Sequence, residues 1–135
     1  MSEEAIVVGW TPNAYGRAAV SAAVREAALR GHRLVVVNAT KGDALVDERY
    51  AADSDRAALE SEVAESGVPL EIRQTMGVDV AEQVLAVADE VSASLVVIGL
   101  RRRSPVGKLI MGSVAQRILL SADCPVLAVK PGASD

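Results

Sequence analysis

Short runs of apolar residues alternate with longer amphipathic segments along this chain. The apolar runs have the length and the Val, Ile and Leu content of strands, and the segments between them carry apolar residues at helical spacing. This alternation indicates βαβ units and a parallel sheet covered by helices. Strands are predicted at Ala5–Val8, Leu34–Val37, Leu70–Gln74, Leu95–Ile98 and Val126–Val129.

Helices are predicted between these strands. Tyr15–Arg30 is rich in Ala and ends at Gly31, and the charged segment Asp47–Ser66 ends at Gly67. A third helix begins in Asp79–Glu82 and a fourth in Ser113–Gln116, and both segments have the residue spacing of a capping box.

The strands differ in how their side chains alternate. Ile6-Val7-Val8 is apolar throughout, which suits a strand buried on both faces, whereas Leu70 and Ile72 alternate with charged residues and indicate an edge strand. The polar stretch 40–46 is predicted to be a surface loop. We therefore expect a single domain over residues 1–135, with an open parallel sheet and helices on both of its faces.

Composition limits the kinds of partner. A chain of 135 residues can bury roughly two thirds of its unfolded surface, and the absence of Phe means that Ala, Val, Leu and Ile build the core. With one Trp and two Tyr, binding of nucleic acid by aromatic stacking is disfavoured. The net charge of -4 makes the average surface repel polyanions, so a local basic cluster suits a small phosphorylated ligand better than a duplex.

Cys124 is the only cysteine, which excludes an internal disulfide and a cysteine-based metal site. The acidic start Met1–Glu4 does not resemble a secretory signal, and no apolar run approaches the ~18 residues of a membrane span. We expect a cytoplasmic protein without a membrane or nucleic-acid partner.

The segment between the fourth strand and the fourth helix has the features of a phosphate site. The buried run is followed by Gly99, and Gly112 precedes the predicted start of the helix, whose N-terminal amides and dipole favour an anion. Positive charge comes from Arg101, Arg102, Arg103 and Lys108.

Each of these residues also has a purely structural interpretation. The arginines would then form a solvated loop, Gly112 would serve only close packing of helix and sheet, and Ser113 would only cap the helix.

Three other residues are assigned structural roles. His32 follows a helix end, where a dipole or surface role is expected, and Cys124 is expected to be a packed, inert thiol. Trp10 is expected to fill space at the end of the first strand, with the wall of an adenine pocket as its other role.

Other nucleotide and phosphate motifs are excluded. A Walker A loop would need Gly and Ser or Thr where this chain has Arg102 and Leu109. No Gly-x-Gly-x-x-Gly follows the first strand. A response-regulator receiver would need an acceptor Asp after the third strand, where Gln74-Thr75-Met76 stands.

The segment from Gly99 to Ser113 carries a glycine pattern by which the chain resembles a single-domain member of the universal stress protein (UspA-like) family. The family pattern after the fourth strand is Gly, two residues, Gly, nine residues, Gly, and then Ser or Thr. Here Gly99 and Gly112-Ser113 match in register, and Arg102 stands at the middle glycine. The segments Ala122–Val129 and Gly77–Val80 are also similar to the family, so that the resemblance covers essentially the whole chain.

The resemblance implies an adenine-nucleotide alpha-hydrolase-like fold with sheet order 3-2-1-4-5, in which ATP is bound by some members and not by others. A ligand would lie where the strand order reverses, between strands 1 and 4. The implied site residues are Thr11, Pro12, Asn13, Val37, Gly99, Arg101, Arg102, Arg103, Gly112, Ser113 and Val114.

Two positions depart from the nucleotide-binding members of the family. Those members typically have an Asp just after the first strand, where Thr11 is the nearest counterpart here. Arg102 loses the conformational freedom of a glycine, but its guanidinium offers charge-assisted contacts to phosphate.

The resulting hypothesis is a nucleotide-responsive protein of the stress response that binds ATP or another adenine nucleotide, with Mg²⁺ accompanying ATP. Ligand phosphates would order the loop Arg101–Met111 and so change a protein surface. No catalytic set or metal-ligand spacing lies near the loop, which leaves slow ATP hydrolysis as the only activity considered. The alternative is a dimeric scaffold for protein partners that binds no nucleotide.

The last strand predicts the mode of self-association. Val126, Leu127, Ala128 and Val129 are apolar throughout, yet the family's order places them at a sheet edge, where open backbone groups favour pairing. We expect a homodimer joined through this edge, as in family members.

Overall fold

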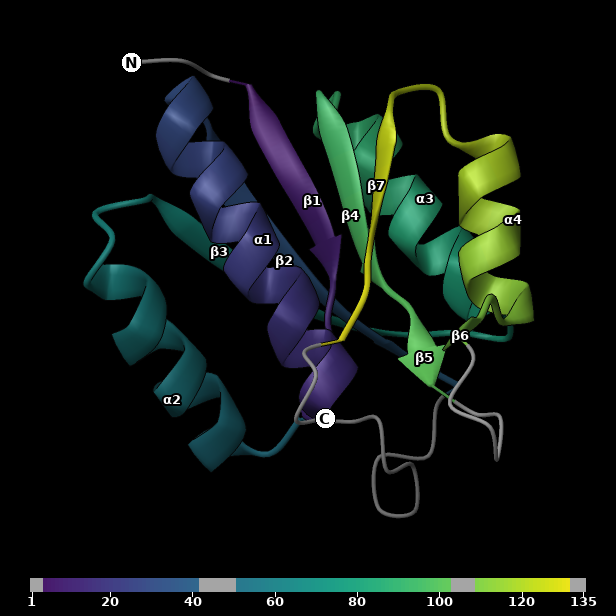
Figure 1. Cartoon of the computed structure of the whole chain (residues 1–135), viewed down its shortest axis with the longest axis horizontal. Helices are drawn as coiled ribbons and strands as arrows, with labels where there is room; N and C mark the ends of the chain where they lie inside the picture. Colours follow the sequence, from purple (N-terminus) through teal and green to yellow (C-terminus); the bar gives the residue numbers. More distant parts are fainter. Residues whose placement is uncertain (1–3, 42–50, 103–108, 132–135) are drawn as a thin grey trace.

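The computed structural model describes residues 4–41, 51–102 and 109–131 (Figure 1). Its elements alternate as the sequence predicts, with one addition, a pair of two-residue strands between the fourth long strand and the last helix. In chain order they are β1 (Ala5–Gly9), α1 (Ala14–Arg30), β2 (Arg33–Thr40), α2 (Asp53–Ala64), β3 (Leu70–Met76), α3 (Val80–Glu90), β4 (Leu95–Gly99), β5 (Arg101–Arg102), β6 (Leu109–Ile110), α4 (Ser113–Ser121) and β7 (Val126–Val129).

The main sheet has five parallel strands in the order β3-β2-β1-β4-β7. The predicted order 3-2-1-4-5 is confirmed, since β7 is the fifth long strand in chain order. The short strands β5 and β6 form a separate antiparallel pair.

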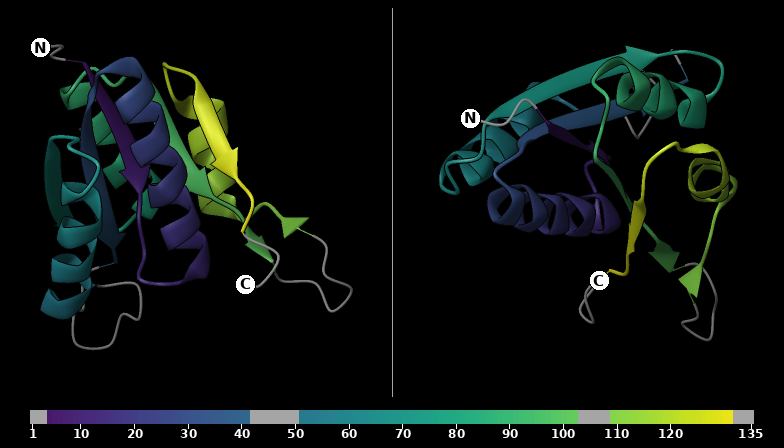
Figure 2. Two further views of the ribbon diagram at one scale, coloured as in Figure 1. Left: turned by 60° about the vertical axis from the view of Figure 1, so that its left-hand side comes forward. Right: turned by 90° about the horizontal axis from the view of Figure 1, so that it is seen from above.

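Helices cover both faces of the sheet, as Figure 2 shows. Side chains of α1 and α2 pack with Ile6 and Val8 of β1 on one face. On the other face, α3 and α4 pack with Val7 of β1. The two faces of β1 are therefore both buried, which explains why its sequence is apolar at every position.

The turn after β1 is folded back onto the start of α1. Asn13 caps the helix, because its side chain accepts a hydrogen bond from the Gly16 amide at 3.0 Å. A Cβ on Gly16 would lie 1.9 Å from the Thr11 carbonyl oxygen, so only glycine permits this close approach. The turn is thereby held at the carboxyl end of β1.

His32 is mostly buried, so the surface role, one of the two roles predicted for it, is wrong. Its side chain is 12% exposed, and its Nδ1 lies 2.9 Å from Ser94 Oγ. Its Nε2 lies 3.2 Å from a Glu4 carboxylate oxygen. His32 thus joins the end of α1 to the segments that enter β1 and β4.

Three predicted boundaries are corrected. Helix α2 begins at Asp53, later than the predicted Asp47, and the Ala52 amide donates a hydrogen bond to Asp55 Oδ2 at 3.0 Å. This contact marks the beginning of the helix, and residues 47–50 lie outside the described part of the chain. Strand β3 extends to Met76, two residues beyond the predicted end. Strand β2 extends to Thr40, three residues beyond the predicted Val37, so Thr40 is a buried strand residue and not the first residue of the predicted surface loop.

The predicted edge position of the third strand is confirmed, and the two edges of the sheet differ in chemistry. Strand β3 carries an ion-pair network in which Arg73 contacts Glu71 and Glu90, and Arg33 of β2 contacts Glu71. Strand β7 at the other edge is apolar in all four residues, and Leu127 is 36% exposed. Within the described ranges, no helix combines the length and the apolar content that a bilayer crossing requires.

Candidate functional site

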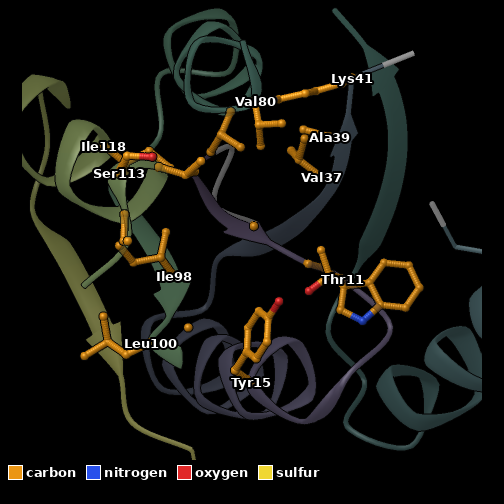
Figure 3. A pocket seen from close by; sticks show the side chains of 17 residues that line it. Thr11, Tyr15, Val37, Ala39, Lys41, Val80, Ile98, Leu100, Ser113 and Ile118 are labelled. Carbon is orange, nitrogen blue, oxygen red and sulfur yellow. The ribbon is translucent and has the colours of Figure 1, made fainter. Parts of the chain in front are cut away.

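A cavity of about 280 Å³ lies at the carboxyl ends of β1 and β4 (Figure 3). These strands are neighbours, and the chain leaves β1 toward β2 on one side and reaches β4 on the other, so the strand order reverses here. Such a switch point is where open α/β sheets bind ligands. The cavity is lined by Gly9, Trp10, Thr11, Tyr15, Val37, Ala39, Lys41, Val80, Val84, Ile98, Gly99, Leu100, Gly112, Ser113, Val114, Ala115 and Ile118.

One side of the cavity is apolar. Val37 and Ala39 alternate along β2, Val80 and Val84 stand one turn apart on α3, and Ile98 ends the buried run of β4. Figure 3 shows Val37, Ala39 and Val80 together on this side, with Ile98 nearer to α4. An apolar wall of this kind suits a planar heterocyclic ring.

The N-terminus of α4 forms another part of the lining. Gly112 is the N-cap, with extended backbone at φ -73° and ψ 170°, and it has no side chain to bond the first-turn amides. The helix begins with the hydrogen bond from the Gln116 amide to the Gly112 carbonyl at 3.0 Å. The first-turn N–H groups and the positive end of the helix dipole therefore lie beside the cavity without a side-chain cap.

Packing does not require a glycine at position 112. A Cβ built there would meet no heavy atom of the described residues within 4 Å, and its backbone angles are open to any residue. The interpretation that Gly112 serves only close packing of helix and sheet is therefore wrong. The missing side chain instead leaves space next to the amides of α4.

Ser113 is the first helical residue and not the cap, so the predicted capping box at Ser113–Gln116 is wrong. Its side chain lines the cavity, across from Thr11 and Tyr15 in Figure 3. The corresponding prediction for α3 is right in part, because Asp79 is the N-cap and accepts from the Glu82 amide at 3.0 Å. The Glu82 carboxylate accepts a hydrogen bond from Arg117 of α4.

The Thr11 hydroxyl has one defined partner. It donates to Asn13 Oδ1 at 3.0 Å, and this oxygen also accepts the capping bond from Gly16. Because this hydroxyl proton is donated to Asn13, Thr11 Oγ1 can act toward a ligand only as a hydrogen-bond acceptor. Thr11 is therefore suited to accept from a hydroxyl or amino group.

Tyr15 and Gly99 set the floor of the cavity between α1 and β4. The Tyr15 hydroxyl points into the cavity in Figure 3. A Cβ on Gly99 would lie 2.4 Å from the Tyr15 carbonyl oxygen, so the end of β4 touches the first turn of α1. Gly99 thus has a packing role in addition to its place in the lining.

The charge of the described lining favours an anion. It contains Lys41 and no carboxylate, so nothing in it repels a phosphate group. Lys41 stands at the rim beside Val80 in Figure 3.

The cavity brings together about half of the predicted site residues, namely Thr11, Val37, Gly99, Gly112, Ser113 and Val114. Pro12 instead lines a neighbouring cavity between α1 and α2, and Asn13 acts as the cap of α1. Arg101 and Arg102 form β5, and Arg103 lies outside the described residues.

Trp10 fulfils its predicted space-filling role. Its side chain is 5% exposed and belongs to the core with Ala51 and Leu59. It also contributes to the cavity lining.

Sequence reasoning missed the contributions of other elements to the lining. Ala39 follows Val37 at an interval of two on β2, and Lys41 follows Ala39 at the same interval just after the strand ends, so their shared side could have been found from strand periodicity. The remaining missed residues become neighbours only through the packing of distant elements; they are Tyr15, Val80, Val84, Ile98, Ala115 and Ile118.

Comparisons of sequence agree with the resemblance noted above. Residues 4–130 match the sequence model of the universal stress protein family. A universal stress protein of Mycolicibacterium smegmatis is 52% identical over 126 residues, which cover 93% of this chain and 97% of the relative.

Solved structures show the same fold. A universal stress protein from Archaeoglobus fulgidus superimposes with a TM-score of 0.79 at 30% identity, covering 96% of this chain and 100% of that one. A universal stress protein of Archaeoglobus fulgidus in complex with dAMP matches with a TM-score of 0.71 at 26% identity, covering 94% of this chain and 98% of that one.

Proposed function

The chain belongs to the universal stress protein family, and from this premise we propose that it binds an adenine nucleotide, with ATP as the main candidate, in the cavity between Thr11 and the N-terminus of α4. In this proposal the bound nucleotide acts as a signal in the stress response of a homodimer. The observation that carries the proposal is the uncapped N-terminus of α4 beside the cavity, next to a glycine that packing does not require.

The phosphates would lie at the first turn of α4. The amides that follow Gly112 have no side-chain cap, and a helix N-terminus binds anions through such amides and through its dipole. The Ser113 hydroxyl lines the same part of the cavity and would add a donor.

The base and sugar would occupy the rest of the cavity. The apolar side formed by Val37, Ala39 and Val80 would contact the adenine ring. Thr11, whose proton is directed to Asn13, would accept a hydrogen bond from a sugar hydroxyl or the exocyclic amine. The A. fulgidus protein in complex with dAMP supports this class of ligand.

The described lining suits a nucleotide better than it suits a magnesium ion. The described lining has no carboxylate, which is the protein ligand that Mg²⁺ most often uses. If Mg²⁺ accompanies ATP here, its ligands would be phosphate oxygens and water.

Titration calorimetry tests the proposal with ATP, AMP and adenosine as probes. We expect ATP and AMP to bind and adenosine to bind more weakly, because adenosine lacks the group that α4 would hold. Absence of heat with all three compounds at millimolar concentration would refute nucleotide binding in this cavity.

The homodimer part of the proposal rests on the edge strand β7. Its outer side pairs with none of the strands that the structure describes, and its residue Leu127 is partly exposed. Pairing of β7 with the same strand of a second copy would satisfy these groups and bury the apolar side chains.

A dimeric scaffold that binds no nucleotide is the second candidate. It is favoured by Thr11, which stands where nucleotide-binding members of the family typically have an Asp. Its hydroxyl is uncharged and already donates to Asn13. Denaturing freshly purified protein and identifying released small molecules by chromatography separates the two candidates. A stoichiometric adenine nucleotide supports the first, and its absence, together with silent calorimetry, supports the scaffold.

A further inference from the structure

Arg117 joins the two helices that form one wall of the cavity. Its Nη1 donates to Asp79 Oδ2, and its Nη2 donates to Glu82 Oε1 at 2.9 Å. Arg117 belongs to α4, Asp79 is the N-cap of α3, and Glu82 belongs to the first turn of α3. In Figure 1 these helices lie side by side on one face of the sheet.

Helix α3 is itself fixed to the sheet through Gln83. The side-chain nitrogen donates to the carbonyl oxygens of Thr40 at 2.9 Å and Gly77 at 3.2 Å. The side-chain oxygen accepts from the Thr75 hydroxyl at 2.6 Å. Because these contacts reach the ends of both β2 and β3, the first turns of α3 have a defined position.

Helix α4 has a lighter attachment to the core. Ile118 is its one buried residue, Val114 and Ala115 are partly buried against the same core, and Leu119 and Leu120 are exposed. Arg117 adds a polar link to this apolar packing, four residues after Ser113 and on the same side of the helix. This link runs from the sheet through Gln83 and α3 to the start of α4.

We propose that Arg117 is a positioning residue, which holds the first turn of α4 at the place where its amides contact the ligand phosphate. The inference rests on the proposed function and adds the residue that controls phosphate affinity from outside the cavity. Arg117 does not line the cavity, and its guanidinium is directed to Asp79 and Glu82, so it acts through the helix.

This role predicts an effect on binding without a large effect on stability. The Arg117 side chain is 46% exposed, and exposed ion pairs contribute little to folding. Arg117→Met removes both donated bonds and keeps most of the apolar stem. We expect this variant to fold and to melt close to the wild-type temperature.

Arg30→Met is the matched control. Arg30 is also a helical arginine paired with a glutamate, Glu26, at 3.1 Å, but the pair lies within α1 at the end remote from the cavity. The two substitutions therefore change charge and side-chain type equally.

Hydrogen exchange of the ligand-free protein tests the link directly. In Arg117→Met, the amides of residues 113–118 should exchange faster than in the wild type, while those of β1 and β2 stay protected. Arg30→Met should leave α4 unchanged. Wild-type exchange rates throughout α4 of Arg117→Met would overturn the inference.

Calorimetry with AMP and adenosine then tests the effect on phosphate binding. We expect Arg117→Met to weaken AMP by about tenfold, which is within the usual range for residues that act through an element, and to change adenosine little. Arg117→Lys, which keeps the charge but offers a single donor group, should recover part of the AMP affinity.

The outcomes separate the inference from the proposed function. If the wild type binds AMP and Arg117→Met binds it with the same affinity, the inference alone is overturned. Equal weakening of AMP and adenosine binding also overturns it, because it indicates a general change of the cavity. Absence of AMP binding to the wild type overturns the proposed function and the phosphate role of Arg117, and the exchange rates still decide whether Arg117 holds α4.

Discussion

Gly99 at the end of β4 lies directly against the main chain of Tyr15, because a Cβ at Gly99 would come within 2.4 Å of the Tyr15 carbonyl oxygen. This contact joins β4, the strand that leads to the proposed phosphate site, with α1, the helix that follows the turn after β1. The neighbouring atom is backbone and cannot rotate away. The contact therefore sets the distance between the two sides of the cavity floor.

The first prediction concerns this contact. Gly99→Ala should lower the free energy of unfolding by about 1–3 kcal/mol, as expected for an overpacked site. Urea denaturation followed by circular dichroism measures the change. An unaltered urea midpoint would show that the cavity floor can relax around the new methyl group. The close approach of Gly99 to Tyr15 would then not fix the distance between β4 and α1.

Gly112→Ser should change stability and affinity in opposite directions. The extended backbone at position 112 is that of an N-cap, and a serine hydroxyl there would bond the first-turn amides of α4. We expect the variant to be more stable than the wild type by a few tenths of a kcal/mol, roughly the difference between Ser and Gly at an N-cap. It should bind AMP more weakly, because the hydroxyl competes with phosphate for the same amides.

Ala52→Ser is the control for this experiment. Ala52 is the N-cap of α2, with φ -73° and ψ 167°, and it lies outside the cavity. The same new cap should stabilise α2 without any change in AMP affinity. If Gly112→Ser binds AMP as well as Ala52→Ser does, the phosphate is not held by α4.

Leu127→Lys should convert the proposed dimer into a monomer. The lysine places a charge on the exposed apolar face of the edge strand, where pairing with a second copy would have to bury it. Sedimentation velocity measures the state of association. Leu29→Lys, at an 82% exposed position on α1, controls for the added charge, and a dimer that persists in Leu127→Lys would rule out β7 as the interface.

Cys124 should react slowly with alkylating reagents. Partial burial, and after it the negative charge of Asp123, raise the pKa of the Cys124 thiol, so less thiolate is present at neutral pH than in an unfolded chain. The rate of reaction with iodoacetamide should therefore rise at a higher pH in the folded protein than in urea. Equal rates in the two states would contradict the expected inert thiol.

Acid should remove a small part of the stability through Glu71. The hydrogen bond from Arg73 lowers the pKa of the Glu71 carboxyl, so the folded state binds a proton there less readily than the unfolded state does. This contribution is present above the unfolded pKa and is lost as the pH falls through the lower folded pKa. Glu71→Gln should make the free energy of unfolding less dependent on pH in this acidic range. The change in that free energy should stay below about 1 kcal/mol, because the ion pair is exposed.

Most of the fold could be predicted from local patterns. Runs such as Leu95–Ile98 are apolar at every position because both faces of the sheet are covered, and this pattern distinguishes inner strands from β3. The start of α2 was missed because charged residues of helical character extend upstream of Asp53, and the contact between Asp55 and Ala52 that marks the start has a weak sequence signal.

Less of the candidate site could be predicted. Val80 and Val84 have the spacing of core residues on α3, and only the packing of that helix beside α4 places them on a cavity. The role of Gly112 is also a three-dimensional property, since the space around a glycine has no signature in the sequence. The single domain, the cytoplasmic location and the accompanying magnesium stay predictions.

The two edge strands of the sheet, β3 and β7, differ in charge, and this difference limits how copies of the chain can assemble. A chain that could pair at both borders would add copies without limit and form fibres. Here the β3 border carries Arg73 and Glu71, whose charges disfavour a second strand, and only β7 presents an apolar border. Self-association through β7 would therefore stop at two copies, with a charged strand closing each end of the joined sheet.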